Sequence, residues 1–333
     1  MTWNKILCNY RELQLMGTLS GGQSFRWTHN KETDEWIGVF SKTLWKLKEN
    51  DNNLQYQVLD SLLNKPSKGK SKKSKAEEVD FKEILESYFR MDTNLGKHYK
   101  EWSDKDELFR NACQQFYGIR MLQQEPVENL FSFICSQNNH ISRISSMVEK
   151  LCTHYGEQIC EYEGNTYYAF PEVEKLCEPE VETELRNLGF GYRAKFIQKS
   201  ASQIVEWGGL QWFDSLQDMK YKDAKIELMK LHGIGPKVAD CICLMSLNHL
   251  DALPVDTHVY QIAAHNYLPH LRGKKNVTEK MYTEIGDHFR SLYGDMAGWA
   301  HTVLFCADLK KFQQNENGGN EKDNGPKKKR KKL

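Results

Sequence analysis

Apolar and polar residues alternate with a period of two through much of the segment between residues 24 and 59. The clearest examples are Trp36 to Phe40, Leu44 to Leu47 and Leu54 to Val58, and turn-rich segments separate them. Alternation over such short runs is typical of strands with one buried face. The pattern therefore predicts a small antiparallel sheet near the N-terminus.

From residue 79 onward the apolar residues recur every three to four positions instead. In the first such run Phe81, Ile84, Leu85, Tyr88 and Phe89 share one helical face. Further helices are expected over residues 102–117, 126–139, 141–155, 181–188, 194–207, 277–293 and 296–312. The chain is thus predicted to have an α+β fold, in which the small antiparallel N-terminal sheet packs on two mainly helical subdomains.

One junction within the helical part, between residues 222 and 248, has a distinctive pattern. A helix is expected to stop at His232-Gly233, and a new one can start at Pro236, directly after Gly235. Glycine is favoured just past a helix end and proline in the first turn of the next helix. The segment predicts a helix-hairpin-helix. Bare backbone amides at Gly233, Gly235 and Val238, together with the helix dipole, are candidate contacts for a phosphate.

Two residues near this hairpin are candidates for chemistry. Lys237 lies in the first turn of the second helix, and Asp256 follows a Leu-Pro-Val loop in a position to cap a third helix. A lysine amine beside a fixed carboxylate can act as a nucleophile with an electrostatic partner. Taken singly, the features also fit a plain turn, a solvated lysine and an ordinary cap. Their order and spacing favour the chemical interpretation.

Composition places the chain among ordinary folded proteins. Its 333 residues are 39% hydrophobic and 27% charged, which is typical of a chain with two or three packed domains. No apolar run reaches 18 residues, so no membrane span is expected, and the N-terminus lacks a secretory apolar segment. The nine cysteines follow no pairing pattern, which indicates a reducing compartment.

The formal net charge of +1 hides an uneven distribution. Lys327 to Lys332 form a basic run, and six lysines lie between Lys65 and Lys75 with no acid among them. Without these residues the chain is net negative, so affinity for nucleic acid must come from a focused groove and the hairpin amides. The terminal run is typical of a nuclear-import signal, with a solubilising tail as the alternative.

The hairpin, the lysine and the aspartate resemble the helix-hairpin-helix Gly/Pro-Asp superfamily of base-excision DNA glycosylases. Over about residues 3–311 the chain resembles the eukaryotic 8-oxoguanine DNA glycosylases in particular. The matching motifs are Gly22 to Trp27, Leu130 to Arg143, Gly189 to Ala194, Lys237 to Met245, Pro254 to Asp256, Ala297 to Ala300 and Val303 to Phe305. The resemblance implies a bifunctional enzyme that excises 8-oxoguanine opposite cytosine in double-stranded DNA, by base flipping and a lysine imine, with β-elimination at the abasic site.

This interpretation divides the chain into three parts. Residues 1–120 are expected to form the N-terminal β domain, with a mobile Lys-rich loop over 65–75 and the following helices. Residues 121–312 form the helical catalytic region, with the helix-hairpin-helix at 222–248 and the Pro-Val-Asp loop at 254–256. Residues 313–333 form a disordered basic tail. A monomeric nuclear protein without a cofactor is expected, bound by the import machinery through its tail, and a mitochondrial form stays open.

The resemblance assigns roles in the base pocket position by position. Lys237 is the nucleophile on C1′ of the sugar, and Asp256 stabilises the positive charge that develops there. Gly22 offers its carbonyl to the N7–H that distinguishes 8-oxoguanine from guanine, with glycine permitting the close approach. Phe305 and Cys241 lie on opposite faces of the base. A Cys241 thiolate beside the lysine would place a dipole across the base, and a simply packed cysteine is the alternative.

Four further residues match positions that contact the gap and the opposite base. Asn138 and Tyr192 match the residues that fill the gap left by the flipped base. Arg143 and Arg193 match the arginines that read the orphaned cytosine, whose N3 and O2 acceptors suit the donors of a guanidinium group. Phosphate contacts or surface ion pairs are the alternative for the two arginines.

Two histidines belong to the same set. His258 matches a contact to the DNA backbone. His301 stands where the family commonly has a glutamine that reads the pairing edge of the base. An amide donates and accepts at once, whereas an imidazole makes one hydrogen bond toward the base. Selectivity for the base is therefore expected to be looser or pH-dependent.

Two other functions remain open at this point: an alkylated-purine glycosylase of the same superfamily and a non-catalytic helix-hairpin-helix DNA-binding protein. The first kind generally lacks the hairpin lysine, and Lys237 with Asp256 argues against the second. No metal site is expected. Cys241 and Cys243 lie roughly 200° apart around a helix, and Cys306 alone is near the position of the four-cysteine cluster that some relatives carry.

Overall fold

The computed structural model describes residues 2–50, 52–65, 79–274 and 276–318. Nearly all of the expected Lys-rich loop and the end of the basic tail lie outside these ranges, and so do the predictions made for them. Within the ranges, none of the helices combines the length and the apolar character that crossing a membrane requires.

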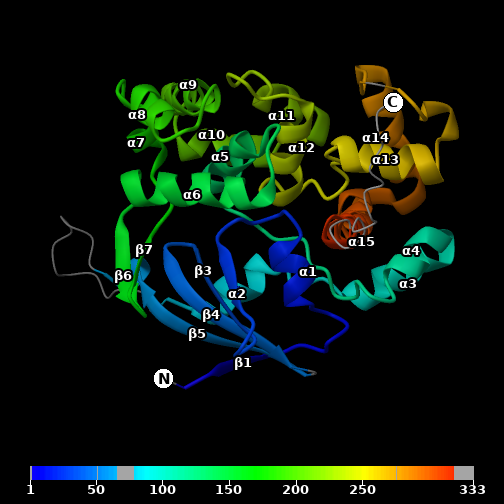
Figure 1. Cartoon of the computed structure of the whole chain (residues 1–333), viewed down its shortest axis with the longest axis horizontal. Helices are drawn as coiled ribbons and strands as arrows, with labels where there is room; N and C mark the ends of the chain where they lie inside the picture. The colour runs from blue at the N-terminus through cyan, green and yellow to red at the C-terminus, as the bar shows by residue number, and fades with distance from the viewer. Residues whose placement is uncertain (1, 51, 66–78, 275, 319–333) are drawn as a thin grey trace, which may run out of the picture.

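The N-terminal part is built on an antiparallel sheet with the strand order β1-β5-β4-β3-β2 (Figure 1). The strands are β1 (Asn4–Leu7), β2 (Trp27–Asn30), β3 (Glu35–Phe40), β4 (Thr43–Asn50) and β5 (Asn53–Ser61). The alternating pattern predicted the last three. It missed β1, an edge strand with Ile6 as its buried residue, because a single buried position shows no period.

Two short helices cover one face of this sheet. They are α1 (Leu15–Ser20) and α2 (Phe81–Tyr88), and the 3-10 turn η1 (Leu62–Asn64) follows β5. Asp80 caps α2 by accepting hydrogen bonds from two backbone amides of its first turn. The ring of Tyr88 then stacks on Phe40 at 3.9 Å, above the fully buried Trp45. Aromatic packing therefore joins the helix to the sheet.

The rest of the described chain is mainly helical. Its helices are α3 (Leu95–Lys105), α4 (Glu107–Ala112), α5 (Pro126–Ser136), α6 (Ile141–Tyr155), α7 (Val173–Leu176), α8 (Val181–Asn187), α9 (Arg193–Glu206), α10 (Leu210–Gln217), α11 (Tyr221–Leu228), α12 (Pro236–Met245), α13 (Thr257–Asn266), α14 (Glu279–Tyr293) and α15 (Ala297–Gly318), with the 3-10 turns η2 (Pro269–Leu271) and η3 (Gly294–Met296). The α+β class and the helix-hairpin-helix expected from the sequence are confirmed.

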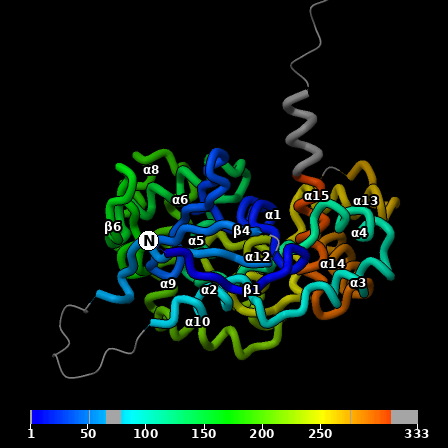
Figure 2. Tube along the Cα trace, turned by 90° about the horizontal axis from the view of Figure 1, so that it is seen from below, coloured from blue at the N-terminus to red at the C-terminus, as the bar shows by residue number. Residues whose placement is uncertain are grey.

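The helices gather into two groups beside the sheet (Figure 2). One end of the molecule holds α5, α6, α8 and α9, and the other holds α3, α4, α13, α14 and the start of α15, with α12 between them. A continuous apolar core runs through the helical part, and α5 is buried on nearly every side. This arrangement brings α12 and α15, which are distant in sequence, close to the N-terminal sheet domain.

Three details differ from the sequence-based expectation. A hairpin of β6 (Gln158–Tyr162) and β7 (Asn165–Tyr168) lies where a loop was expected. Helices α3 and α4, assigned to the 1–120 domain, place Trp102 and Phe109 in the helical core, because a helix's own periodicity does not specify the core it joins. Helix α15 continues to Gly318, beyond the expected helix end at residue 312.

Candidate active site

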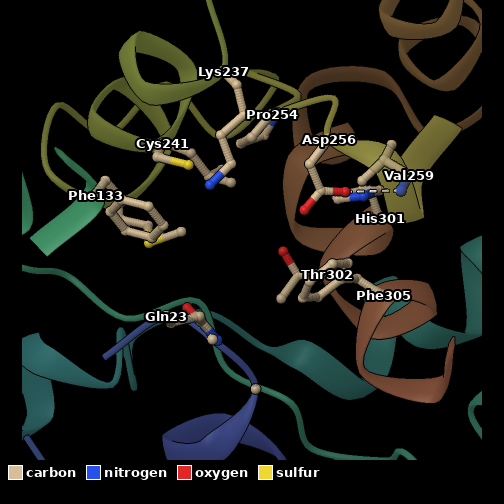
Figure 3. Close-up of a pocket in the computed structure, with 14 residues that line it drawn as sticks. Gln23, Phe133, Lys237, Cys241, Pro254, Asp256, Val259, His301, Thr302 and Phe305 are labelled. Carbon is tan, nitrogen blue, oxygen red and sulfur yellow. Dashed lines mark hydrogen bonds between the residues drawn. The ribbon is translucent and has the colours of Figure 1, made fainter. Parts of the chain in front are cut away.

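A pocket lies where α12, the loop before α13, α15 and the N-terminal domain meet (Figure 3). Six residues assigned to catalysis or base binding line it together: Gly22, Lys237, Cys241, Asp256, His301 and Phe305. Its remaining walls are Gly21, Gln23, Phe133, Leu244, Met245, Pro254, Val259 and Thr302. The structure thus brings into one place residues that are up to 283 positions apart between Gly22 and Phe305.

Lys237 extends from the first turn of α12 into this pocket (Figure 3). Pro236 starts the helix, so the lysine is the second residue of the first turn and its direction is set by a rigid element. Its Nζ lies 4.6 Å from the centre of the Phe133 ring, which offers the negative face of an aromatic group to the cation. The amine is thus held at an apolar wall.

Asp256 faces the lysine from the start of α13 (Figure 3). Its Oδ1 accepts hydrogen bonds of 2.9 Å from the backbone amides of His258 and Val259. These bonds make it the N-cap that the sequence predicted, and the helix dipole favours its negative charge. Because one oxygen is used in capping, the carboxylate has a fixed orientation and its other oxygen faces the pocket.

His301 and Phe305 contribute rings from successive turns of α15. The two ring centres are 6.2 Å apart, and His301 is 5% exposed. Burial lowers the pKa of His301 to about 4, and the nearby Asp256 charge opposes this shift only in part. The imidazole is therefore neutral at physiological pH. Neither of its ring nitrogens has a hydrogen-bond partner among the described residues.

Cys241 lies one turn after Lys237 on the same face of α12. Burial raises the pKa of its thiol to about 11, and the positive charge of Lys237 opposes that shift. The thiol is therefore protonated at neutral pH in the unbound protein. This disfavours the thiolate–ammonium pair considered from the sequence, because desolvation outweighs one neighbouring positive charge.

Gly22 approaches the pocket from the N-terminal domain. Its φ of +79° lies in the left-handed region, and a Cβ at this position would lie 3.6 Å from the Phe305 ring. Gln23 anchors the segment because its side chain bonds the carbonyl of Arg120 at 2.8 Å and the amide of Leu122 at 2.9 Å. The backbone beside the pocket is thus anchored by two buried hydrogen bonds of the Gln23 side chain.

The hairpin before α12 is closed around a glycine. Gly233 has a φ of +82°, and a Cβ there would lie 2.4 Å from the Phe196 ring. Its carbonyl accepts a hydrogen bond of 2.8 Å from Gln137 at the end of α5. Gly235 is the N-cap of α12, and Val238 lies in that helix's first turn. Amides of a first turn have no partner within their own helix, so this end of α12 suits an anion.

Comparison with known proteins gives the same picture. Residues 5–130 match the family model of the 8-oxoguanine DNA glycosylase N-terminal domain, and residues 131–286 match that of the HhH-GPD superfamily of base excision DNA repair proteins. A Saccharomyces cerevisiae N-glycosylase/DNA lyase is 36% identical over 92% of this chain and 86% of its own length. The chain belongs to the 8-oxoguanine DNA glycosylase family.

Other members of the family show similar sequences and folds. The Arabidopsis thaliana N-glycosylase/DNA lyase OGG1 is 36% identical over 92% of this chain and 80% of its own length. A solved Clostridium acetobutylicum 8-oxoguanine glycosylase/lyase, in complex with double-stranded DNA containing cytosine opposite to 8-oxoG, aligns with a TM-score of 0.75. That structure is 28% identical in sequence, and the alignment covers 90% of this chain and 93% of the Clostridium chain.

The residues matched to the gap and the opposite base form a second cluster in this glycosylase, between the end of α5 and the start of α9. Arg193 is 4% exposed, and its Nη2 donates to the carbonyls of Gln137 and of Asn138, the latter at 3.1 Å. Tyr192 is 45% exposed and donates to the same Gln137 carbonyl at 3.2 Å. Arg143 donates to the Gly189 carbonyl at 3.3 Å.

A groove connects the surface of the glycosylase with the pocket. It shares Gly22, Phe133, Lys237, Asp256 and Phe305 with the pocket and adds polar residues such as Asn139, His140, Ser142 and His258. His258 lies 3.4 Å from Asp308 of α15, so its ring is oriented by a carboxylate. The groove therefore offers polar groups on the path to Lys237.

Several functional residues were not found from the sequence. Phe133, whose ring lies beside the lysine, and Gln23, which follows Gly22, are examples. Gln137 is a third, because it bonds both the hairpin and the second cluster. No periodic signal marks Phe133, because nearly every residue of α5 is buried, including polar ones. The predicted helix ends at the segment that contains Gln137, but the sequence assigned no role to that residue.

No group of three or more potential metal ligands occurs among the described residues. The absence of an iron–sulfur cluster stays a prediction, which a visible absorption spectrum of the purified protein checks.

Proposed function

We propose that this protein excises 8-oxoguanine from DNA where it is opposite cytosine, and then cleaves the strand at the resulting abasic site. The observation that carries the proposal is the pairing of Lys237 and Asp256 in one pocket with Gly22 and Phe305. Membership of the 8-oxoguanine DNA glycosylase family supports the substrate. The double-stranded DNA bound by the Clostridium relative supports DNA as the partner.

The first chemical step acts on the sugar of the flipped nucleotide. Lys237 must first lose the proton that gives it its positive charge. Its neutral amine then attacks C1′, the bond between C1′ and the base breaks, and the base leaves with the bonding electrons and takes up a proton. Positive charge develops on the sugar during this step, and the capped carboxylate of Asp256 stabilises it. Because that carboxylate is already oriented by two amides, it does not need to reorganise.

The second step follows from the covalent product. Ring opening and loss of a proton convert the attached sugar to an imine of Lys237. The imine makes the C2′ hydrogens acidic, so a base removes one of them and the bond from C3′ to the phosphate oxygen breaks. Hydrolysis of the imine then releases the amine. One lysine therefore accounts for both base release and strand cleavage.

The base is proposed to be read at three places. The carbonyl of Gly22 accepts from N7–H, which guanine lacks, and a mismatch there costs about 1–3 kcal/mol. Phe305 stacks on the base, opposite Cys241, and the buried neutral His301 offers one nitrogen to its pairing edge. Discrimination by the carbonyl alone is modest, so flipping and closure add to it.

The second cluster is proposed to hold the undamaged strand. Tyr192, which is exposed, and Asn138 enter the gap, while Arg143 and Arg193 donate to the orphaned cytosine. In the unbound protein both guanidinium groups donate to backbone carbonyls instead. Each guanidinium group has five N–H donors, so donors that these bonds do not use are available to the cytosine.

We also propose that the protein acts as a monomer in the nucleus and that its basic run, Lys327 to Lys332, binds the import machinery. A fluorescent fusion is expected to accumulate in nuclei and to lose this accumulation when the run is replaced by alanines. Equal distribution of both fusions contradicts the import role and leaves the chemistry untouched.

Single-turnover assays on matched duplexes test the proposed chemistry. The wild type is expected to release the base from a duplex with one 8-oxoguanine opposite cytosine, and to leave a duplex with guanine at that position intact. Asp256→Asn is expected to bind the damaged duplex but release the base at least about a hundredfold more slowly, in the range that single electrostatic groups supply. Release of an alkylated purine in place of 8-oxoguanine would favour the other glycosylase class.

A further inference from the structure

Another polar cluster, separate from the one that contains Arg143 and Arg193, lies inside the protein. Its centre is Asp240 of α12, which is 0% exposed. The carboxylate accepts three hydrogen bonds: 2.7 Å from the hydroxyl of Tyr221, 2.8 Å from Nζ of Lys225 and 2.5 Å from the hydroxyl of Tyr282. The donors come from α11 and α14, so the cluster ties both helices to the helix that carries Lys237.

Such a cluster is costly to bury unless every charge is compensated. A buried carboxylate needs several donors, and Lys225 adds an opposite charge within direct contact. Burial and the neighbouring Asp240 charge raise the pKa of the Tyr282 hydroxyl, which therefore stays protonated and donates to the carboxylate. The geometry of the cluster is thus well determined, because three donors converge on one buried carboxylate.

Tyr282 differs from the other two donors because its hydroxyl also has hydrogen-bond partners in the segment that leads to Asp256, among them the Leu253 carbonyl at 3.3 Å. Its oxygen also accepts a hydrogen bond of 3.2 Å from the backbone amide of Val255. Val255 is the middle residue of the Pro-Val-Asp loop and directly precedes Asp256. A continuous path of hydrogen bonds therefore runs from α12 through Asp240 and Tyr282 to the backbone next to the carboxylate in the pocket.

We infer that Tyr282 is a positioning residue, which fixes the backbone at Val255 relative to α12 and so sets the placement of the Asp256 carboxylate against Lys237. The inference rests on the roles proposed above for Lys237 and Asp256. Asp240 is three residues after Lys237 on the same helix. A hydrogen bond to Asp240 therefore fixes its donor relative to the helix that carries the nucleophile. Displacements of about 1 Å between reacting groups can cost a hundredfold in rate.

The chain offers a matched control for this inference. Tyr221→Phe and Tyr282→Phe each remove one hydroxyl and one bond to Asp240. Only the second change also leaves the Val255 amide without its acceptor. Any effect of a weakened cluster on folding is shared by the two variants, so a difference between them isolates the bond to the loop.

The experiment measures three quantities for both variants and the wild type: the thermal midpoint, the Kd for a damaged duplex and the single-turnover rate of base release. Tyr282→Phe is expected to release the base about tenfold more slowly or worse, with a Kd unchanged within about twofold. Tyr221→Phe is expected to keep the wild-type rate despite a similar loss of thermal stability. Equal rates for the two variants overturn the inference.

A second substrate separates positioning from general damage. On a preformed abasic site no bond to a base has to break, so the Asp256 carboxylate has less charge to stabilise. Tyr282→Phe is therefore expected to retain most of its borohydride-trapped adduct on that substrate. If the wild type itself gives no adduct, the proposed function fails and the inference that rests on it is overturned as well. An adduct with equal rates for both variants rejects the positioning role alone.

If Tyr282→Phe does not fold, amide hydrogen exchange in the wild type provides the test. The Val255 amide is expected to exchange slowly, because its acceptor is buried within the protein. Tyr221→Phe is expected to leave that amide protected. Rapid exchange at Val255 in the folded wild type overturns the inference.

Discussion

Replacing His301 by glutamine tests the electrostatics of the pocket most sharply. The histidine is buried, its pKa is lowered to about 4, and the described residues give its ring nitrogens no partner. Protonation would place a positive charge in an apolar site, and the attraction of the nearby Asp256 carboxylate offsets that cost only in part. His301→Gln removes the titrating group and keeps a side chain that can donate and accept hydrogen bonds.

The expected size of the effect follows from the difference in pKa between the two states. The unfolded chain binds a proton at His301 near pH 6.5 and the folded chain only near pH 4. Between these values the unfolded state binds more protons, so the free energy of unfolding falls as the pH falls. The contribution of the neutral His301 to the free energy of unfolding is fully present above pH 6.5. About 2 kcal/mol of it is lost by pH 5, and about 3 kcal/mol once the pH reaches 4.

The assay is denaturant unfolding of the wild type and His301→Gln at pH 7.5 and pH 5. His249 and His288, whose pKa values burial also lowers, are present in both proteins and cancel in the comparison. The wild type is expected to lose about 2 kcal/mol more than the variant over this interval. An equal loss in both proteins would refute the claim that His301 is buried in its neutral form.

Further predictions concern the glycines and the cysteine. Gly233→Ala is expected to destabilise the protein by about 1–3 kcal/mol or more because of its positive φ and the Phe196 ring, whereas Gly235→Ala, with nothing near its Cβ, is expected to cost no more than about 1 kcal/mol, because alanine is a poorer N-cap residue than glycine. Gly22→Ala is expected to reduce discrimination between 8-oxoguanine and guanine about tenfold in competitive single-turnover assays. Cys241→Ser is expected to weaken binding of the damaged duplex in a fluorescence titration, and equal affinities would contradict a contact to the base.

The sequence predicted the parts of this fold that have strong local signals. The hairpin was visible because glycine and proline mark the end of one helix and the start of the next, and Asp256 was visible as a cap. Strand β1 and the β6–β7 hairpin were missed, since short strands with few buried positions have no measurable period. Local patterns also could not assign α3 and α4 to the helical core.

In the candidate site, too, local sequence signals identified some residues, whereas the contacts that depend on tertiary structure were missed. Lys237 and Asp256 were found from the local pattern around the hairpin. Gly22, Cys241, His301 and Phe305 were found through a resemblance carried by motifs distant from one another in the chain. The contacts between those motifs depend on tertiary structure, so the Phe133 ring beside Lys237 and the Tyr282 bond to Val255 could not be predicted. The protonated Cys241 thiol is another example, because its pKa depends on burial that spacing along a helix does not reveal.

Borohydride trapping tests the central claim most directly. The protein is incubated with a duplex that carries one 8-oxoguanine opposite cytosine, the reductant is added, and the covalent product is digested and analysed by mass spectrometry. The account predicts one adduct, located on Lys237, and no adduct in Lys237→Gln. Base release without an adduct on Lys237 in the wild type would contradict it.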